Sequence, residues 1–171
     1  MTGDERRLFL LKTISNRTTP ISASKLATIT KVSRQVIVGD VALLRAQGHD
    51  IIATRRGYVM HYEDDRFIAK IAVNHTYEQT ELELKTLVKL GIHIIDVTVG
   101  HPIYGELTGQ LNIKNLDDVN DFIKELSSGK AELLSSLTQG IHLHTISCPD
   151  ETSYNQALNA LDKLGFIIKN Q

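Results

Sequence analysis

The chain has 171 residues, of which 42% are hydrophobic and 23% charged, a balance typical of a soluble globular protein. No apolar run approaches the roughly 20 residues that a membrane span needs, and the acidic start of the chain lacks the apolar segment of a signal peptide. The only cysteine, Cys148, excludes an intrachain disulfide and fits a reducing compartment. We therefore expect a cytoplasmic protein.

The net charge of −1 conceals two halves of opposite sign. Residues 1–61 carry ten Lys and Arg side chains against four acidic ones, giving +6, whereas the remainder carries nine against sixteen, giving −7. This asymmetry predicts two domains with different partners, which we place at residues 1–62 and 66–171. The polar stretch 61–65 is expected to be a short connector. The basic half is the candidate for binding DNA.

Helical periodicity in the basic half predicts three helices, at about residues 4–16, 23–28 and 33–47. Two short strands, 51–54 and 58–60, follow and are joined by a basic turn. Three helices followed by a hairpin with a basic tip are typical of a winged helix-turn-helix. The inner face of the third helix is expected to be Val36, Ile37, Val41 and Leu44.

The third helix is the predicted recognition helix of this motif. The N-terminus of such a helix meets the edges of bases, whereas other basic groups hold phosphates. We therefore predict DNA contacts from the start of the third helix and from the hairpin tip. The predicted DNA-binding residues are Ser33, Arg34, Gln35, Arg55 and Arg56.

The acidic half alternates strand-like and helix-like segments in the order β-α-β-β-α-β-α-β. The predicted strands are 66–73, 92–99, 106–113, 140–145 and 166–168, and the predicted helices are 77–90, 116–126 and 150–164. This order predicts an α+β protein whose second domain is a ferredoxin-like (βαββαβ-type) sheet with its helices on one face.

A candidate metal site lies in this half. His142 and His144 alternate with apolar residues on a predicted strand, so both imidazoles point to one face, roughly 6.6 Å apart along the chain. His75 lies at a junction between strand and helix. Three imidazoles and a carboxylate suit zinc, nickel, iron or manganese rather than calcium. Helical position alone does not choose among the glutamates that follow His75: Glu78, Glu81 and Glu83.

Several short segments resemble known families. The segments 25–27, 32–35 and 43–45 are similar to the helix-turn-helix of bacterial repressors related to the biotin-operon repressor. The segments Gly-His-Pro-Ile-Tyr-Gly-Glu (100–106) and Gly-Ile-His-Leu-His-Thr (140–145) resemble the three-histidine (3H) domain. With both segments combined, the chain resembles the niacin-responsive transcriptional repressors of Gram-positive bacteria over nearly its whole length.

This resemblance implies a repressor of genes for niacin uptake or NAD biosynthesis. It implies nicotinic acid as co-repressor and a homodimer on a palindromic double-stranded operator. It also implies one divalent transition metal per chain, nickel, zinc, iron or manganese, held by three histidines and a glutamate. These ligands correspond to His75, Glu83, His142 and His144. A tentative role in binding the effector falls on His101 and Tyr104.

Two alternatives remain open. Three histidines and a glutamate with an open coordination position could activate water, which would suit a metal-dependent hydrolase of a small pyridine amide. We do not expect an enzyme, because the sequence offers no second acid–base set with recognisable spacing and carries a DNA-binding motif. The other alternative retains the repressor but changes the small molecule that it senses.

Overall fold

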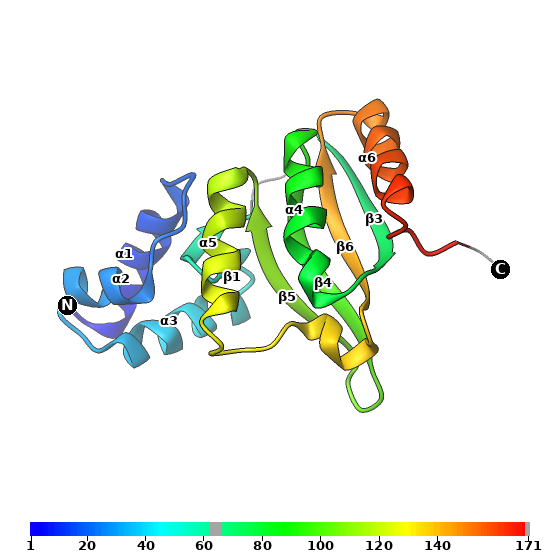
Figure 1. Cartoon of the computed structure of the whole chain (residues 1–171). Helices are drawn as coiled ribbons and strands as arrows, with labels where there is room; N and C mark the ends of the chain where they lie inside the picture. Colours follow the sequence, from blue (N-terminus) through cyan, green and yellow to red (C-terminus); the bar gives the residue numbers. More distant parts are fainter. Residues whose placement is uncertain (62–65, 170–171) are drawn as a thin grey trace. The chain divides into compact units, whose positions relative to one another are not determined.

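The computed structural model describes residues 1–61 and 66–169, which form two compact units (Figure 1). Apart from His61, the predicted connector falls on residues 62–65, outside the described residues. Within the described ranges, every helix is too short or too polar to cross a membrane. The two units are considered separately below.

The N-terminal unit consists of three helices and a two-stranded hairpin. The helices are α1 (Gly3–Ser15), α2 (Ala23–Thr30) and α3 (Arg34–Ala46), and the strands are β1 (Ile51–Thr54) and β2 (Gly57–Met60). Each helix begins after a hydroxyl side chain that accepts a hydrogen bond from the first turn, which stabilises its start. These caps are Thr2, Ser22 and Ser33.

A buried carboxylate fixes α3 against α1. Asp40 on α3 is only 4% exposed and accepts hydrogen bonds from Arg6 Nε at 2.5 Å and Arg7 Nη1 at 3.2 Å. Since a buried charge is tolerated only when paired, these bonds determine where α1 lies on α3. The apolar core below them contains Leu10, Ile14, Leu26, Ile37, Val41, Leu44 and Ile51.

The hairpin is held to the chain before α2. Ile21 and Tyr58 exchange two backbone hydrogen bonds of 2.9 Å, which adds a third short segment to β1 and β2. Gly57 permits this approach, because a Cβ there would lie 2.2 Å from Ile21 O and the residue has a φ of +129°. The two turn residues, Arg55 and Arg56, form the tip of the hairpin, as predicted.

The C-terminal unit is a four-stranded antiparallel sheet with helices on one face (Figure 1). Its strands are β3 (Phe67–Asn74), β4 (His93–His101), β5 (Gly105–Ile113) and β6 (Ile141–Cys148). Its α-helices are α4 (Thr80–Lys89), α5 (Leu116–Ser127) and α6 (Glu151–Lys163), and its short 3-10 helices are η1 (Tyr77–Gln79) and η2 (Leu134–Thr138). The α+β prediction is thus confirmed.

The strand order, β3-β6-β4-β5, differs from that of a ferredoxin-like sheet. Successive elements run β-α-β-β-α-β, and the helices share one face, as predicted. The first and third strands, however, form the two edges of the sheet, whereas they are central in a ferredoxin-like sheet. The predicted last strand is reduced to one bridge between Val73 and Ile167.

The placement of β6 in the centre of the sheet decides where its histidines lie. Side chains of β6 alternate between the helix-covered face and the open face. Ile146 and Cys148 enter the apolar core beneath the helices, and His142 and His144 continue the same face. The imidazoles therefore lie under the helices, where α4 supplies the facing side chains.

A β-bulge interrupts β4 beside this region. Between Ile94 and Asp96 the pairing with β6 shifts register, because two steps along β4 oppose one step from Ile146 to Thr145. Ile95 is the extra residue. Such bulges bend a strand and change where its groups point.

Candidate functional site

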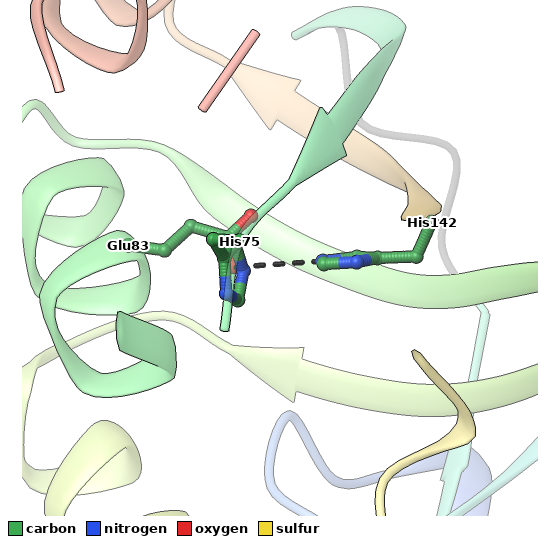
Figure 2. A group of neighbouring side chains, drawn as sticks. All are labelled: His75, Glu83 and His142. Atoms are coloured by element: carbon green, nitrogen blue, oxygen red, sulfur yellow. Dashed lines mark hydrogen bonds and ion pairs between the residues drawn. The ribbon is translucent and has the colours of Figure 1, made fainter. Parts of the chain in front are cut away.

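Four polar side chains meet in the interior of the C-terminal unit. His75 follows β3, Glu83 lies on α4, and His142 and His144 lie on β6. Their exposed fractions are 7%, 1%, 4% and 3%, respectively. Figure 2 shows His75, Glu83 and His142 pointing toward one another from these three elements. We call these four residues the histidine–glutamate cluster.

The local backbone explains why these residues converge. Gly140, just before β6, has a φ of +97°, and a Cβ there would lie 2.4 Å from His75 O. Glycine therefore allows the start of β6 to lie directly against the backbone of His75. A capping box formed by Thr76 and Gln79 then turns the chain into η1 and α4, which brings Glu83 back over the imidazoles.

Each imidazole is oriented through its Nδ1 atom. These atoms donate to backbone carbonyls at 2.8 Å: His75 to Thr76 O, His142 to Gly140 O and His144 to Asp96 O. The bulge in β4 is what brings the Asp96 carbonyl to His144. Because all three Nδ1 atoms are occupied, all three Nε2 atoms are available on the side that faces Glu83.

The Nε2 atoms surround one carboxylate. His75 Nε2 hydrogen-bonds to Glu83 Oε2, and His142 Nε2 lies 3.5 Å from the same oxygen. His144 Nε2 lies 3.0 Å from Glu83 Oε1, close enough for an ion pair but without the alignment of a hydrogen bond. Glu83 Oε1 and His144 Nε2 are therefore buried without a hydrogen-bond partner among the described residues.

The charges in the cluster shift the pKa values of its members. Burial by itself would raise the pKa of Glu83, but the charge of His144 and hydrogen bonds from the imidazoles hold it well below its usual range. Burial would lower the pKa values of His75 and His144, but Glu83 outweighs burial and raises both. Without a metal, Glu83 and the imidazoles of His75 and His144 thus stabilise one another's charged forms.

The donor set fits a divalent transition metal. Nitrogen atoms of His75 and His142 and an oxygen of Glu83 lie within 4.8 Å of one another, and His144 Nε2 is beside the second carboxylate oxygen. Imidazole nitrogens with a carboxylate are typical ligands of zinc and nickel. The Nδ1–carbonyl bonds are the outer interactions that usually fix metal-binding histidines. A metal would replace the protons on Nε2 and would use the two unpartnered atoms.

Two cavities adjoin the cluster. The smaller, about 30 Å³, is lined by the four cluster residues together with Thr80 and apolar side chains of α4, α5 and the sheet. The larger, about 440 Å³, is lined by Asn74, Thr76, Tyr77, Gln139 and other polar residues. Both share His75, Leu133 and Ser135. A small molecule in the larger cavity would therefore lie beside His75.

Among the three glutamates that the sequence left open, only Glu83 faces the cluster. Glu81 instead pairs with Lys85 at 2.7 Å on the surface, and its side chain is 45% exposed. Glu78 lies in η1 and is also exposed. The structure thus brings together the predicted set His75, Glu83, His142 and His144.

The tentative effector residues lie elsewhere. His101 is the last residue of β4, and Tyr104 lies in the turn before β5, where it is 71% exposed. His101 Nδ1 accepts hydrogen bonds from the backbone N atoms of Ile103 and Tyr104 at 3.1 and 3.3 Å. Both residues lie outside the described linings of the two cavities. This arrangement favours a role in shaping the turn.

The predicted DNA-contacting residues form two exposed groups in the N-terminal unit. Ser33 caps α3, with its hydroxyl accepting from Val36 N at 3.3 Å, and Arg34 and Gln35 are exposed in its first turn. Arg56 is exposed at the hairpin tip, whereas Arg55 is half-buried. These groups are the start of the predicted recognition helix and the tip of the predicted wing.

The prediction for Val36 was wrong. Its side chain is 38% exposed, because it lies about 100° around α3 from Ile37, outside the arc that buries Ile37, Asp40, Val41 and Leu44. Gly39 lies one turn away on the exposed side, and no described atom lies within 4 Å of where its Cβ would be. A glycine inside a helix destabilises it by about 1 kcal/mol relative to alanine. No packing reason for this glycine is found in the described structure.

Sequence reasoning also missed Thr80 and the carbonyl of Asp96. Thr80 carries no pattern that distinguishes it from an ordinary first-turn residue of a helix. The role of Asp96 O depends on the bulge in β4, which results from pairing with a strand 48 residues away. Neither feature has a local signal in the sequence.

Comparisons with known proteins match each part of the chain to a family. Residues 6–59 match a family described as an HTH domain, and residues 68–170 match the 3H domain. The chain is 41% identical to the "Transcription repressor NadR" of Bacillus subtilis (strain 168), over 98% of this chain and 96% of that protein. It is 38% identical to the "Probable transcription repressor NiaR" of Thermotoga maritima, over 96% and 94%, respectively.

Proposed function

Because this chain belongs to the family of helix-turn-helix transcription repressors that carry a 3H domain, we propose that it represses genes of niacin uptake or NAD biosynthesis, with nicotinic acid as co-repressor. In this proposal residues 1–62 bind operator DNA, and residues 66–171 bind a divalent metal and the effector. Similarity over nearly the full length of both relatives supports the repressor function.

The observation that carries the regulatory part is the orientation of the three imidazoles. Their Nδ1 atoms are bound to carbonyls, and their Nε2 atoms face the buried carboxylate of Glu83. His75, Glu83, His142 and His144 would hold the metal. When bound, it would supply a Lewis-acid site for the carboxylate or ring nitrogen of nicotinic acid. The adjoining cavity of about 440 Å³ has room for such a small molecule.

The proposed mechanism couples this site to DNA through a homodimer. Two recognition helices bind half-sites about one turn of DNA apart, ~34–36 Å. The start of α3, with Arg34 and Gln35, would meet base edges, and Arg56 at the hairpin tip would hold a phosphate. Nicotinic acid strengthens repression only if it binds the DNA-competent dimer arrangement more tightly than the alternative arrangement.

The test is operator binding by the full chain, with and without nicotinic acid, before and after chelation. The operator is first selected from random DNA at fixed salt, because affinity for DNA depends on salt. In the metal-loaded protein, we expect nicotinic acid to raise operator affinity by roughly tenfold or more. After chelation, we expect nicotinic acid to leave operator affinity unchanged. Equal affinity with and without nicotinic acid in the metal-loaded protein would contradict the proposal.

Glu83→Gln and Glu81→Gln form a matched pair for this experiment. Both remove one carboxylate from α4, but Glu83 is 1% exposed in the cluster, whereas the side chain of Glu81 is 45% exposed. Glu83→Gln should abolish the response to nicotinic acid and metal. Glu81→Gln should retain it.

A further inference from the structure

The hydroxyl of Thr80 is buried without a partner in the part of the chain that the structure describes. Thr80 begins α4, is 5% exposed, and its Oγ1 makes no hydrogen bond with any described residue. Buried polar groups in folded proteins are almost always hydrogen-bonded, and an unsatisfied hydroxyl destabilises the fold. The position of Thr80 therefore requires an explanation.

Four other helical threonines, including Thr86 of α4 itself, behave differently. They return their hydroxyls to the carbonyl four residues earlier, the usual solution in a helix. The examples are Thr13 to Phe9 at 2.7 Å, Thr28 to Ser24 at 3.1 Å, Thr30 to Leu26 at 2.7 Å and Thr86 to Leu82 at 2.6 Å.

Thr80 lacks this solution because of the histidine–glutamate cluster. The carbonyl four residues before it belongs to Thr76, which already accepts hydrogen bonds from His75 Nδ1 at 2.8 Å and Gln79 N at 3.1 Å. The bond that orients His75 thus occupies the acceptor that Thr80 would otherwise use.

Thr80 instead lines the smaller cavity. It lies three residues before Glu83, so both side chains project from the same face of α4. The cavity, about 30 Å³, is large enough for a water molecule or a ligand atom. Its other walls are the three histidines and mainly apolar side chains, including Leu84, Val97 and Phe122. A water molecule or ligand bound in this cavity could therefore hydrogen-bond to the Thr80 hydroxyl.

We propose that Thr80 is a ligand-positioning residue, whose hydroxyl hydrogen-bonds to an oxygen atom of the species bound beside Glu83. That oxygen belongs either to a water on the metal or to the carboxylate of the effector. The identity of the effector rests on the proposed function, whereas the role of the hydroxyl toward a metal-bound oxygen does not. A β-branched side chain in a helix has few χ1 rotamers, so Thr80 holds its hydroxyl in a defined direction.

The test uses the full chain and two titrations by calorimetry. The first titrates Zn²⁺ into metal-free protein, and the second titrates nicotinic acid into zinc-loaded protein. Thr80→Val removes the hydroxyl while keeping the shape of the side chain. We expect it to weaken at least one of the two affinities by roughly three- to tenfold, the effect of one lost hydrogen bond. Thr80→Ser, which keeps the hydroxyl, should restore most of the affinity.

Thermal unfolding of the metal-free variants provides a second readout. Because the hydroxyl has no partner among the described residues, Thr80→Val should leave the unfolding midpoint of metal-free protein unchanged or raise it. The matched control is Thr98→Val, since Thr98 is also buried but its hydroxyl bonds to that of Thr108 at 2.8 Å. This control should lower the midpoint and leave both affinities unchanged.

The outcomes separate the alternatives. Weaker zinc binding would assign the oxygen to a metal-bound water, and a loss confined to nicotinic acid would assign it to the effector. Unchanged affinities in both titrations, or a midpoint lowered as much as in Thr98→Val, would overturn the inference. If wild-type protein binds zinc but not nicotinic acid, the proposed function fails, and the zinc titration alone decides the role of Thr80.

Discussion

Removal of metal should give this protein an unusual dependence of stability on pH, because two buried histidines hold extra protons in the folded state. Glu83 raises the pKa values of His75 and His144 above the usual value of about 6.5. Their contribution to stability is therefore fully present below pH 6.5. It is lost as the pH rises through their folded-state pKa values.

The size of this effect follows from the number of protons. Above pH 6.5 the unfolded chain releases protons from both histidines, whereas the folded chain retains them until its higher pKa values are reached. Each retained proton changes the free energy of unfolding by up to about 1.4 kcal/mol per pH unit. His75 and His144 together thus give a decline of up to about 2.7 kcal/mol per pH unit.

The contribution of Glu83 to stability depends on pH in the opposite direction. Its pKa is lowered well below the usual value of about 4.3, so its contribution is present above that pH and is lost as the pH falls through its folded-state pKa. The contribution of the cluster to the stability of metal-free protein should therefore be greatest between about pH 4.3 and 6.5. Metal reverses the trend at higher pH, because it binds deprotonated imidazoles and binds more tightly as protons leave.

The assay is urea unfolding between pH 5.5 and 8.5, with chelator or with saturating Zn²⁺. Metal-free protein should lose stability above pH 6.5, and the stabilisation by zinc should grow over the same range. Glu83→Gln should remove the decline, since the carboxylate is what raises the pKa values of the two histidines. A flat or rising curve for metal-free wild-type protein between pH 6.5 and 7.5 would refute the reasoning.

Four substitutions test other parts of the molecule. Gly39→Ala should raise the free energy of unfolding by about 1 kcal/mol, because alanine favours the helix more than glycine does. It should also lower operator affinity, because its methyl group would lie between this face of α3 and DNA. Unchanged affinity would show that this face remains clear of DNA. Gly140→Ala should weaken zinc binding at least tenfold, because a Cβ would lie 2.4 Å from His75 O. Arg56→Ala should weaken binding to all DNA sequences and reduce the salt slope by about 1. Arg34→Ala should instead relax the base preference measured by selection, whereas an unaltered preference would contradict the assigned contact.

The alternation of a strand was enough to predict that His142 and His144 share a face. The helical pattern could not select the carboxylate ligand, because Glu81 and Glu83 both flank the apolar side of one helix. The choice depends on how α4 rotates over the sheet, which is set by packing against α5, α6 and β4. Periodicity likewise did not predict that Asp40 would be buried, since its burial depends on arginines of another helix.

The order of the strands was likewise beyond local signals. The sequence predicts strands and helices from periodicity, but β6 enters between β3 and β4 through pairing over long separations in the chain. The effector role of His101 and Tyr104 stays a prediction. In the structure they lie at the end of the β4–β5 hairpin, where His101 Nδ1 accepts hydrogen bonds from the turn.

The bulge in β4 has a consequence for how this site can evolve. Ile95 is the one extra residue that lets the Asp96 carbonyl accept from His144 while Ile94 still pairs with Ile146. Deleting one residue here would leave every ligand in the sequence but would redirect that carbonyl. The proposed metal binding would therefore depend on the length of β4 as well as on residue identity, and a relative with the same four residues but a shorter strand would be expected to lack the site.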